Sequence, residues 1–167
     1  MSALITRRNL LGSGAAAATL VGLNARPRAQ APVRAGFVYV GPIGDHGWTY
    51  RHEVGRKDLE AALGDQVATT FVENVSEGPD AERVIRQLAA AGNNIVFTTS
   101  FGFMNPTARV AQQFPDVKFE HCTGYQTAGN LAVYNARFYE GRTVIGYIAG
   151  QMSEAGTAGY IASFPIP

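Results

Sequence analysis

Short apolar runs alternate with segments of helical periodicity along most of the chain, and this alternation restricts the possible folds more than any other feature. We predict strands from the apolar runs and helices from the periodic segments. The predicted strands are 35–40, 67–72, 94–98, 117–121, 130–134 and 158–162, and the predicted helices are 50–63, 81–91, 105–114 and about 139–153. This order favours a doubly wound α/β domain, an αβα sandwich in which helices cover both faces of a mostly parallel sheet.

Apolar residues at helical spacing predict which face of each helix is buried. We expect the first helix to bury the face that carries Val54, Leu59, Ala62 and Leu63. We expect the second helix to bury Ala81, Val84, Ile85, Leu88 and Ala89. Small residues in the last helix predict close packing against the sheet or another helix; they are Gly141, Gly146, Ala149 and Gly150.

Residues 1–31 have the pattern of an export signal. Arg7 and Arg8 precede an uncharged apolar run at 10–23, and Ala-Gln-Ala follows at 29–31 as a small-residue cleavage site. The run is too short to span a bilayer, which takes about 20 residues, and the arginine pair followed by two leucines resembles a twin-arginine (Tat) signal. From this pattern we expect a protein exported to the periplasm. The alternative is that the segment forms a short N-terminal helix of the domain.

Charge and cysteine content argue against several other classes of protein. The chain has 14 Lys and Arg against 13 Asp and Glu with no basic stripe, so we expect no nucleic-acid partner. The single cysteine, Cys122, lies far from the signal and offers no site for lipid attachment. His121 and Cys122 would leave a strand on opposite faces, and no zinc-ligand spacing is present. We predict neither a catalytic site nor a metal or other cofactor.

Two aromatic loops occupy the place where such a sheet binds ligands. In the common strand order 2-1-3-4-5, the ligand lies beyond the carboxyl ends of strands one and three, where the order reverses. The loops leaving those strands are 41–50 and 99–104. Flat aromatic faces beside a few polar groups suit a small planar heterocycle. The candidate ligand-binding residues are Asp45, Trp48, Tyr50, Ser100, Phe101, Gly102 and Phe103.

Each of these residues has a structural alternative. Trp48 and Tyr50 could begin the helix and pack under the loop, and Asp45 could be an N-cap or turn residue. One of the pair Phe101 and Phe103 is expected to face the core. The glycines at 41, 44 and 47, with Glu73 at the end of the next strand, also suggest a dinucleotide-binding unit, although their spacing is not G-x-G-x-x-G.

The stretches FVYVGPIGDHGWTY at 37–50, YEG at 139–141 and YIAG at 147–150 resemble the basic membrane protein (BMP) family of substrate-binding proteins. The resemblance covers 35–167. It implies a type I periplasmic binding protein, with two αβα lobes joined by a hinge, that delivers its ligand to an ABC permease. Residues 32–167 would be the N-terminal lobe, truncated near the first hinge crossing because the sequence stops just after a predicted strand.

The same resemblance implies a purine-like ligand. Asp45 stands in the place of the family's base-binding aspartate, Trp48 stands where an aromatic and polar pair usually follows, and 101–103 falls on the family's second loop. The family often has an acid for the ribose after the fourth strand, but 122–125 contains none. Both a purine nucleoside and a nucleobase therefore stay open, and a monomer is expected. The alternatives are an exported NAD(P)-dependent oxidoreductase and an exported sensory domain.

Overall fold

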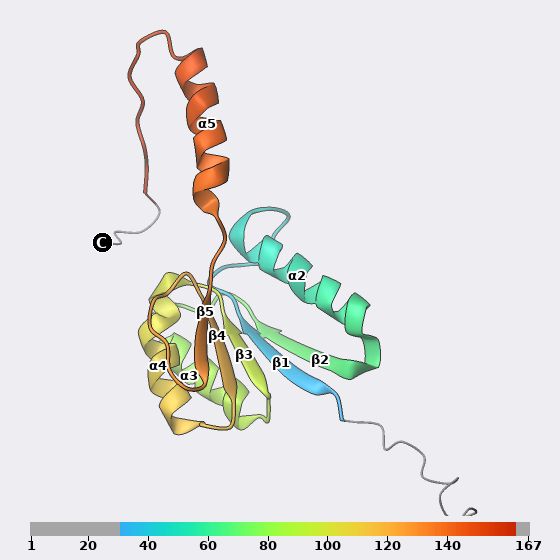
Figure 1. Ribbon diagram of the computed structural model, residues 1–167. Coiled ribbons are helices and arrows are strands. Elements are labelled where there is room, and N and C mark those ends of the chain that lie inside the picture. Colours follow the sequence, from blue (N-terminus) through green and yellow to red (C-terminus); the bar gives the residue numbers. More distant parts are fainter. Residues whose placement is uncertain (1–30, 163–167) are drawn as a thin grey trace, which may run out of the picture.

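A computed structural model describes residues 31–162, so the predicted export signal lies almost entirely outside the described residues. In residues 31–162 the chain forms four α-helices and five of the six predicted strands, which alternate except that β4 and β5 follow each other directly (Figure 1). Element bounds differ from the predicted ones by three residues at most. The strands are β1 (Val33–Val38), β2 (Val67–Val72), β3 (Ile95–Thr98), β4 (Lys118–Cys122) and β5 (Leu131–Tyr134), and the helices are α2 (Gly47–Leu63), α3 (Pro79–Ala90), α4 (Met104–Gln113) and α5 (Phe138–Met152).

All five strands run parallel in the order β2-β1-β3-β4-β5, which confirms the predicted doubly wound sheet. In the register, Val38 of β1 pairs with Val72 on one side and with Thr98 on the other. The strand order therefore reverses at β1, and the carboxyl ends of β1 and β3 lie side by side. A ligand site is expected at this edge.

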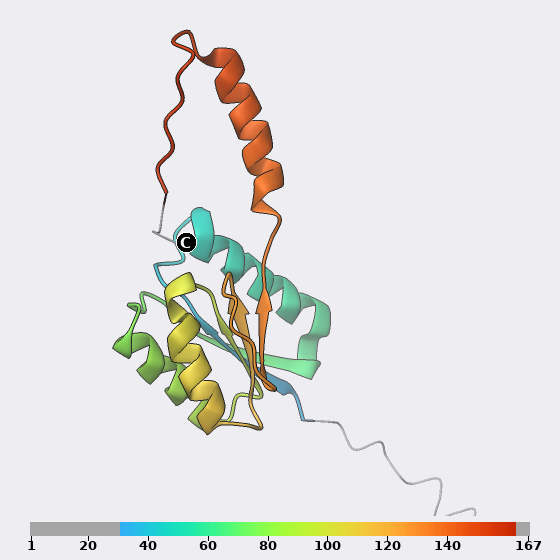
Figure 2. The same ribbon diagram turned by 60° about the vertical axis from the view of Figure 1, so that its left-hand side comes forward.

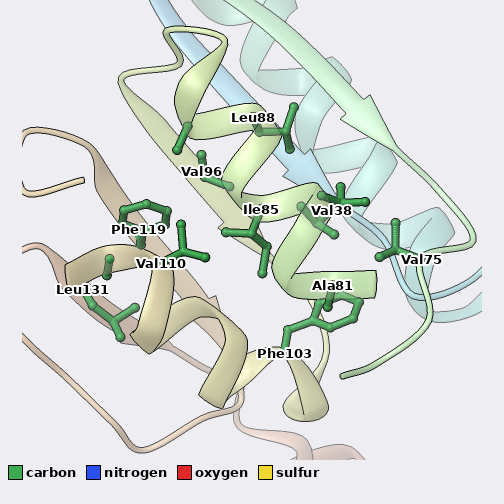
Figure 3. Packing of buried hydrophobic residues seen from close by; sticks show 13 residues of the cluster. Val38, Val75, Ala81, Ile85, Leu88, Val96, Phe103, Val110, Phe119 and Leu131 are labelled. Carbon is green, nitrogen blue, oxygen red and sulfur yellow. The ribbon is translucent and has the colours of Figure 1, made fainter. Parts of the chain in front are cut away.

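Helices α3 and α4 cover one face of the sheet with an apolar core. All five residues predicted for the buried face of α3 are buried. They interlock with side chains from β1, β3, β4 and α4 (Figure 3), including Val38, Val96, Phe119 and Val110. Burial of this apolar surface stabilises this half of the lobe.

Helix α2 lies on the other face, but it buries the predicted apolar stripe only in part. Leu63 is exposed, whereas Thr49, Glu53 and Arg56 are buried. The Arg56 guanidinium donates to both carboxylate oxygens of Glu53, at 2.7 Å from Nε and 2.6 Å from Nη2, and the Tyr39 hydroxyl donates to Glu53 at 3.2 Å. Of the predicted face, Leu59 packs against the buried cluster of Ala35, Phe37 and Tyr39, whereas Ala62 and Leu63 are exposed. The prediction is therefore wrong for the end of the helix, and a hydrogen-bonded ion pair supplies most of the buried contact with β1 and β2.

Helix α5 stands away from the sheet, and the chain then runs back along it without regular structure (Figures 1 and 2). Its side chains are exposed, and a Cβ added at Gly141, Gly146 or Gly150 would meet nothing within 4 Å. The predicted packing of α5 against the sheet is wrong for the part of the chain that the structure describes. The predicted strand at 158–162 is also wrong, because this segment pairs with no described strand and Ile161 is 95% exposed.

Candidate ligand-binding site

A pocket of about 680 Å³ lies at the carboxyl edge of β1 and β3, where the strand order places a ligand site. This volume is within the range of small-molecule sites. The lobe side of the pocket is formed mainly by the loops after β1, β3, β4 and β5, and the facing side by α5 and the segment after it. The lining residues are Val40, Trp48, Ser100, Phe101, Thr123, Asn135, Phe138, Arg142, Tyr160 and Ala162.

Trp48 connects the two predicted ligand loops. Trp48 lies in the first turn of α2, because this helix starts at Gly47, three residues before the predicted start. Its indole Nε1 donates to the backbone carbonyl of Thr99, at 2.5 Å, and its ring lies 5.8 Å from the ring of Phe138. The indole therefore joins the start of α2 to the beginning of the loop after β3 and also lines the pocket.

The other two predicted residues of the first loop lie outside the pocket lining. Asp45 is exposed in the bend before α2, and the N-cap residue is His46, which makes no side-chain capping bond. Tyr50 is half-buried and packs edge-on against His46, with the ring centres 6.2 Å apart. Gly47 has φ +90°, a backbone conformation that favours glycine, so the sharp entry into α2 depends on it.

The second loop divides its two phenylalanines between the pocket and the core. Ser100 and Phe101 line the pocket. Phe103 is fully buried among α3 and β1 side chains (Figure 3), which agrees with the expectation that one of the pair faces the core. The turn between them is the 3-10 helix η2 (Phe101–Phe103), closed by the amide of Phe103, which donates to the Ser100 carbonyl at 3.0 Å. Gly102 sits at the middle of this turn, half-buried and outside the lining.

Several lining residues were not predicted from the sequence. Thr123 and Asn135 directly follow the ends of β4 and β5, at the same carboxyl edge of the sheet but away from the point where the strand order reverses. Arg142 and Tyr160 come from α5 and the segment after it, with the guanidinium 5.3 Å from the centre of the Tyr160 ring. The local sequence does not identify these two residues as ligand-binding, because their position at the pocket depends on the direction in which α5 extends from the sheet.

Burial favours the neutral forms of two histidines and a cysteine near the pocket. Burial lowers the pKa of His121 to about 4, and the ring Nδ1 lies 2.9 Å from the Thr98 hydroxyl. Burial also lowers the pKa of His52 and raises the pKa of the Cys122 thiol. Within residues 31–162, no three His, Cys, Asp or Glu side chains are grouped as metal ligands. Among the lining residues, Arg142 alone carries a formal charge.

Residues 32–167 match a family model, Bmp, described as ABC transporter substrate-binding protein PnrA-like. The chain belongs to this family. A purine-binding protein of Brucella abortus (strain 2308) is 59% identical over 152 residues, 90% of this chain and 43% of that protein. A Haloferax volcanii protein described as an ABC transporter glucose-binding protein is 40% identical over 135 residues, 81% of this chain and 34% of that protein. This Bmp-family chain thus spans less than half the length of both relatives.

A solved structure shares the fold of this Bmp-family chain. The solute-binding protein of an ABC transporter system from Conexibacter woesei DSM 14684 superposes with a TM-score of 0.60 at 24% identity, over 71% of this chain and 40% of that one. Members of the Bmp family are substrate-binding proteins and not enzymes, in agreement with the predicted absence of catalysis. In residues 31–162, no helix has both the length and the apolar character needed to cross a bilayer.

The alternative of a dinucleotide-binding domain finds no support in the geometry. Glu73, the acid that would bind a ribose, accepts a hydrogen bond from the Ile43 amide at 2.8 Å. Its carboxylate therefore holds the first loop. The Bmp family match also points to a solute-binding protein and not to an oxidoreductase.

Proposed function

We propose that this chain provides one side of the ligand site of an ABC-importer substrate-binding protein and that the ligand is a small planar, purine-like solute. The observation that carries the proposal is the aromatic lining of the pocket at the carboxyl edge of β1 and β3. Four of its ten lining residues are Trp48, Phe101, Phe138 and Tyr160. Aromatic side chains supply large apolar contact area and stack on flat rings in offset or edge-on arrangements.

Polar groups within the lining can orient a nucleobase. The Ser100 hydroxyl donates to Glu77 and the Thr123 hydroxyl donates to the Cys122 carbonyl, so each offers an acceptor to a ligand, while the Asn135 amide nitrogen offers donors. A purine presents donors and acceptors around its ring edge, so neutral groups of both kinds suit it. In this proposal Trp48, Ser100 and Phe101 contact the ligand, Asp45 and Tyr50 contribute only if the first loop moves, and Gly102 and Phe103 shape the second loop.

The chain would bind its ligand between this lobe and a second one, and the closed form would dock on the membrane permease. The name of the Brucella relative supports a purine, and the name of the Haloferax relative makes glucose the competing ligand. Export to the periplasm by a twin-arginine signal, the lack of a lipid anchor and the monomeric state stay predictions.

Trp48 is the only tryptophan of the chain, so its emission reports on the pocket directly. We would titrate the chain with adenine, guanine, adenosine, guanosine, glucose and NAD up to millimolar concentrations, since a dissociation constant of 1 mM corresponds to about 4 kcal/mol of binding free energy. Saturable quenching by a purine and not by glucose or NAD is the expected result. A response to glucose alone, or to none of the six, would contradict the purine proposal.

A further inference from the structure

The connection between β2 and α3, residues 73–78, touches both loops of the proposed site without lining the pocket. Building on the proposed function, we propose that Glu77 is a positioning residue that holds the second ligand loop in its binding conformation. Its carboxylate Oε1 accepts two hydrogen bonds from that loop. One comes from the Ser100 hydroxyl at 2.6 Å and the other from the Gly102 amide at 3.1 Å.

The glycine at position 102 is explained by this contact. A Cβ added there would lie 2.1 Å from the Glu77 carboxyl carbon and 2.2 Å from Oε2. Such distances are far inside van der Waals contact, so any side chain at 102 would displace the carboxylate. Gly102 is therefore needed for the close approach of Glu77, and its amide is already used by that carboxylate.

Phe101 is consequently fixed from both sides. Before it, Ser100 is bound by Glu77, and after it, Phe103 is anchored in the core between α3 and the sheet (Figure 3). The Phe101 ring then faces the pocket before any ligand arrives. A binding group that is already ordered loses less conformational entropy on binding, which strengthens affinity.

The connection that carries Glu77 is itself firmly held. Val75 is buried in the core, and its amide donates to the Tyr39 carbonyl at 3.0 Å. Two residues earlier, Glu73 accepts from the Ile43 amide in the first loop. Glu73 thus makes the equivalent contact on the other loop and provides a matched control for Glu77.

The first arm of the test measures amide hydrogen exchange in the ligand-free chain. Glu77→Ala removes the acceptor, and exchange at residues 100–103 should rise about tenfold, the amount expected from the loss of one or two hydrogen bonds. Glu77→Gln keeps an acceptor and should stay within about threefold of wild type. Glu73→Ala should accelerate exchange at 41–46 and leave 100–103 unchanged. Unchanged exchange at 100–103 in Glu77→Ala would overturn the proposal.

The second arm measures the dissociation constant for adenine through Trp48 emission. Glu77→Ala and Gly102→Ala should each weaken binding about three- to tenfold, while Glu77→Gln should restore most of the affinity. Faster exchange with unchanged affinity would also overturn the proposal, because Glu77 would then hold the loop without serving the ligand. Failure of the wild-type chain to bind a purine contradicts the proposed function itself and is seen before any variant is compared.

Discussion

The two faces of the sheet are stabilised in different ways. Helices α3 and α4 bury an apolar cluster on one face, whereas α2 places a hydrogen-bonded ion pair, Glu53 with Arg56, on the other. Buried charges require complete pairing because their removal from water is costly, while apolar side chains require only close packing. The α2 face therefore combines a smaller apolar cluster, Ala35, Phe37 and Tyr39, with a few specific bonds, whereas the α3 face depends on many interchangeable contacts.

The largest effect is expected where a single bond partner is removed from the α2 face. Glu53→Ala removes the acceptor of the Tyr39 hydroxyl and the buried partner of Arg56, whose remaining ion pair is with the half-exposed Glu60 at 2.8 Å. We expect the free energy of unfolding to fall by about 3–5 kcal/mol, measured by denaturant titration. Replacing both partners, as Glu53→Leu with Arg56→Met, should recover most of this loss. A double variant as unstable as Glu53→Ala would contradict the account of a paired charge.

A truncation in the apolar face should cost somewhat less. Ile85 is fully buried between α3 and the sheet (Figure 3). Ile85→Ala is expected to lower the free energy of unfolding by about 3 kcal/mol and Ile85→Val by about 1 kcal/mol, because the cavity grows with the volume removed. Thermal or denaturant unfolding measures both variants. Equal losses for the two variants would show that this face does not respond as a packed core.

His121 makes the apolar face sensitive to acid. Its native pKa of about 4 lies below the ordinary value of 6.5, so the unfolded chain binds a proton at higher pH than the native one. Stability is therefore lost as the pH falls from about 6.5 toward 4, by about 2 kcal/mol between pH 7 and pH 5. Burial also lowers the pKa of His52, so both histidines contribute to the loss of stability in acid. Comparing the pH profile of stability of the wild type with that of His121→Gln isolates the contribution of His121. A pH profile unchanged by His121→Gln would refute the assignment.

The smallest effect is expected on α5, which packs on neither face. Ile145 is 67% exposed in the middle of this helix. Ile145→Ser should change the free energy of unfolding by less than about 0.5 kcal/mol, as is usual for surface positions. A loss above about 1 kcal/mol would show that α5 packs against the lobe in solution.

The same two faces explain what the sequence could and could not predict. Apolar spacing was sufficient for α3, because each apolar residue on that stripe is buried by the sheet and α4. It was sufficient only for Leu59 of α2, because the fully buried residues of that helix are polar, and their pairing depends on Tyr39 and Thr69, which are distant in sequence. The strand at 158–162 was predicted from an apolar run alone, and such a run does not show whether a partner strand lies beside it.

The candidate site was predicted as far as strand order determines it. The ends of β1 and β3 meet as expected, and Trp48, Ser100 and Phe101 line the pocket there. Phe101 faces the pocket and Phe103 faces the core because a 3-10 turn joins them. The sequence predicted that one of the two would be buried but not which one. Glu77 carries no motif, because its role arises from two contacts across more than twenty residues of sequence.

The central claim is that a planar purine-like solute stacks in this pocket, and calorimetric titration with adenine tests it most directly. Phe101 lines the pocket, whereas Tyr147 is an exposed aromatic on α5 outside the lining and serves as the matched control. We predict saturable binding by the wild type, about three- to tenfold weaker binding by Phe101→Ala from the loss of aromatic stacking, and unchanged binding by Tyr147→Ala. Equal affinity in the wild type and Phe101→Ala, or no heat of binding in the wild type, would contradict the account.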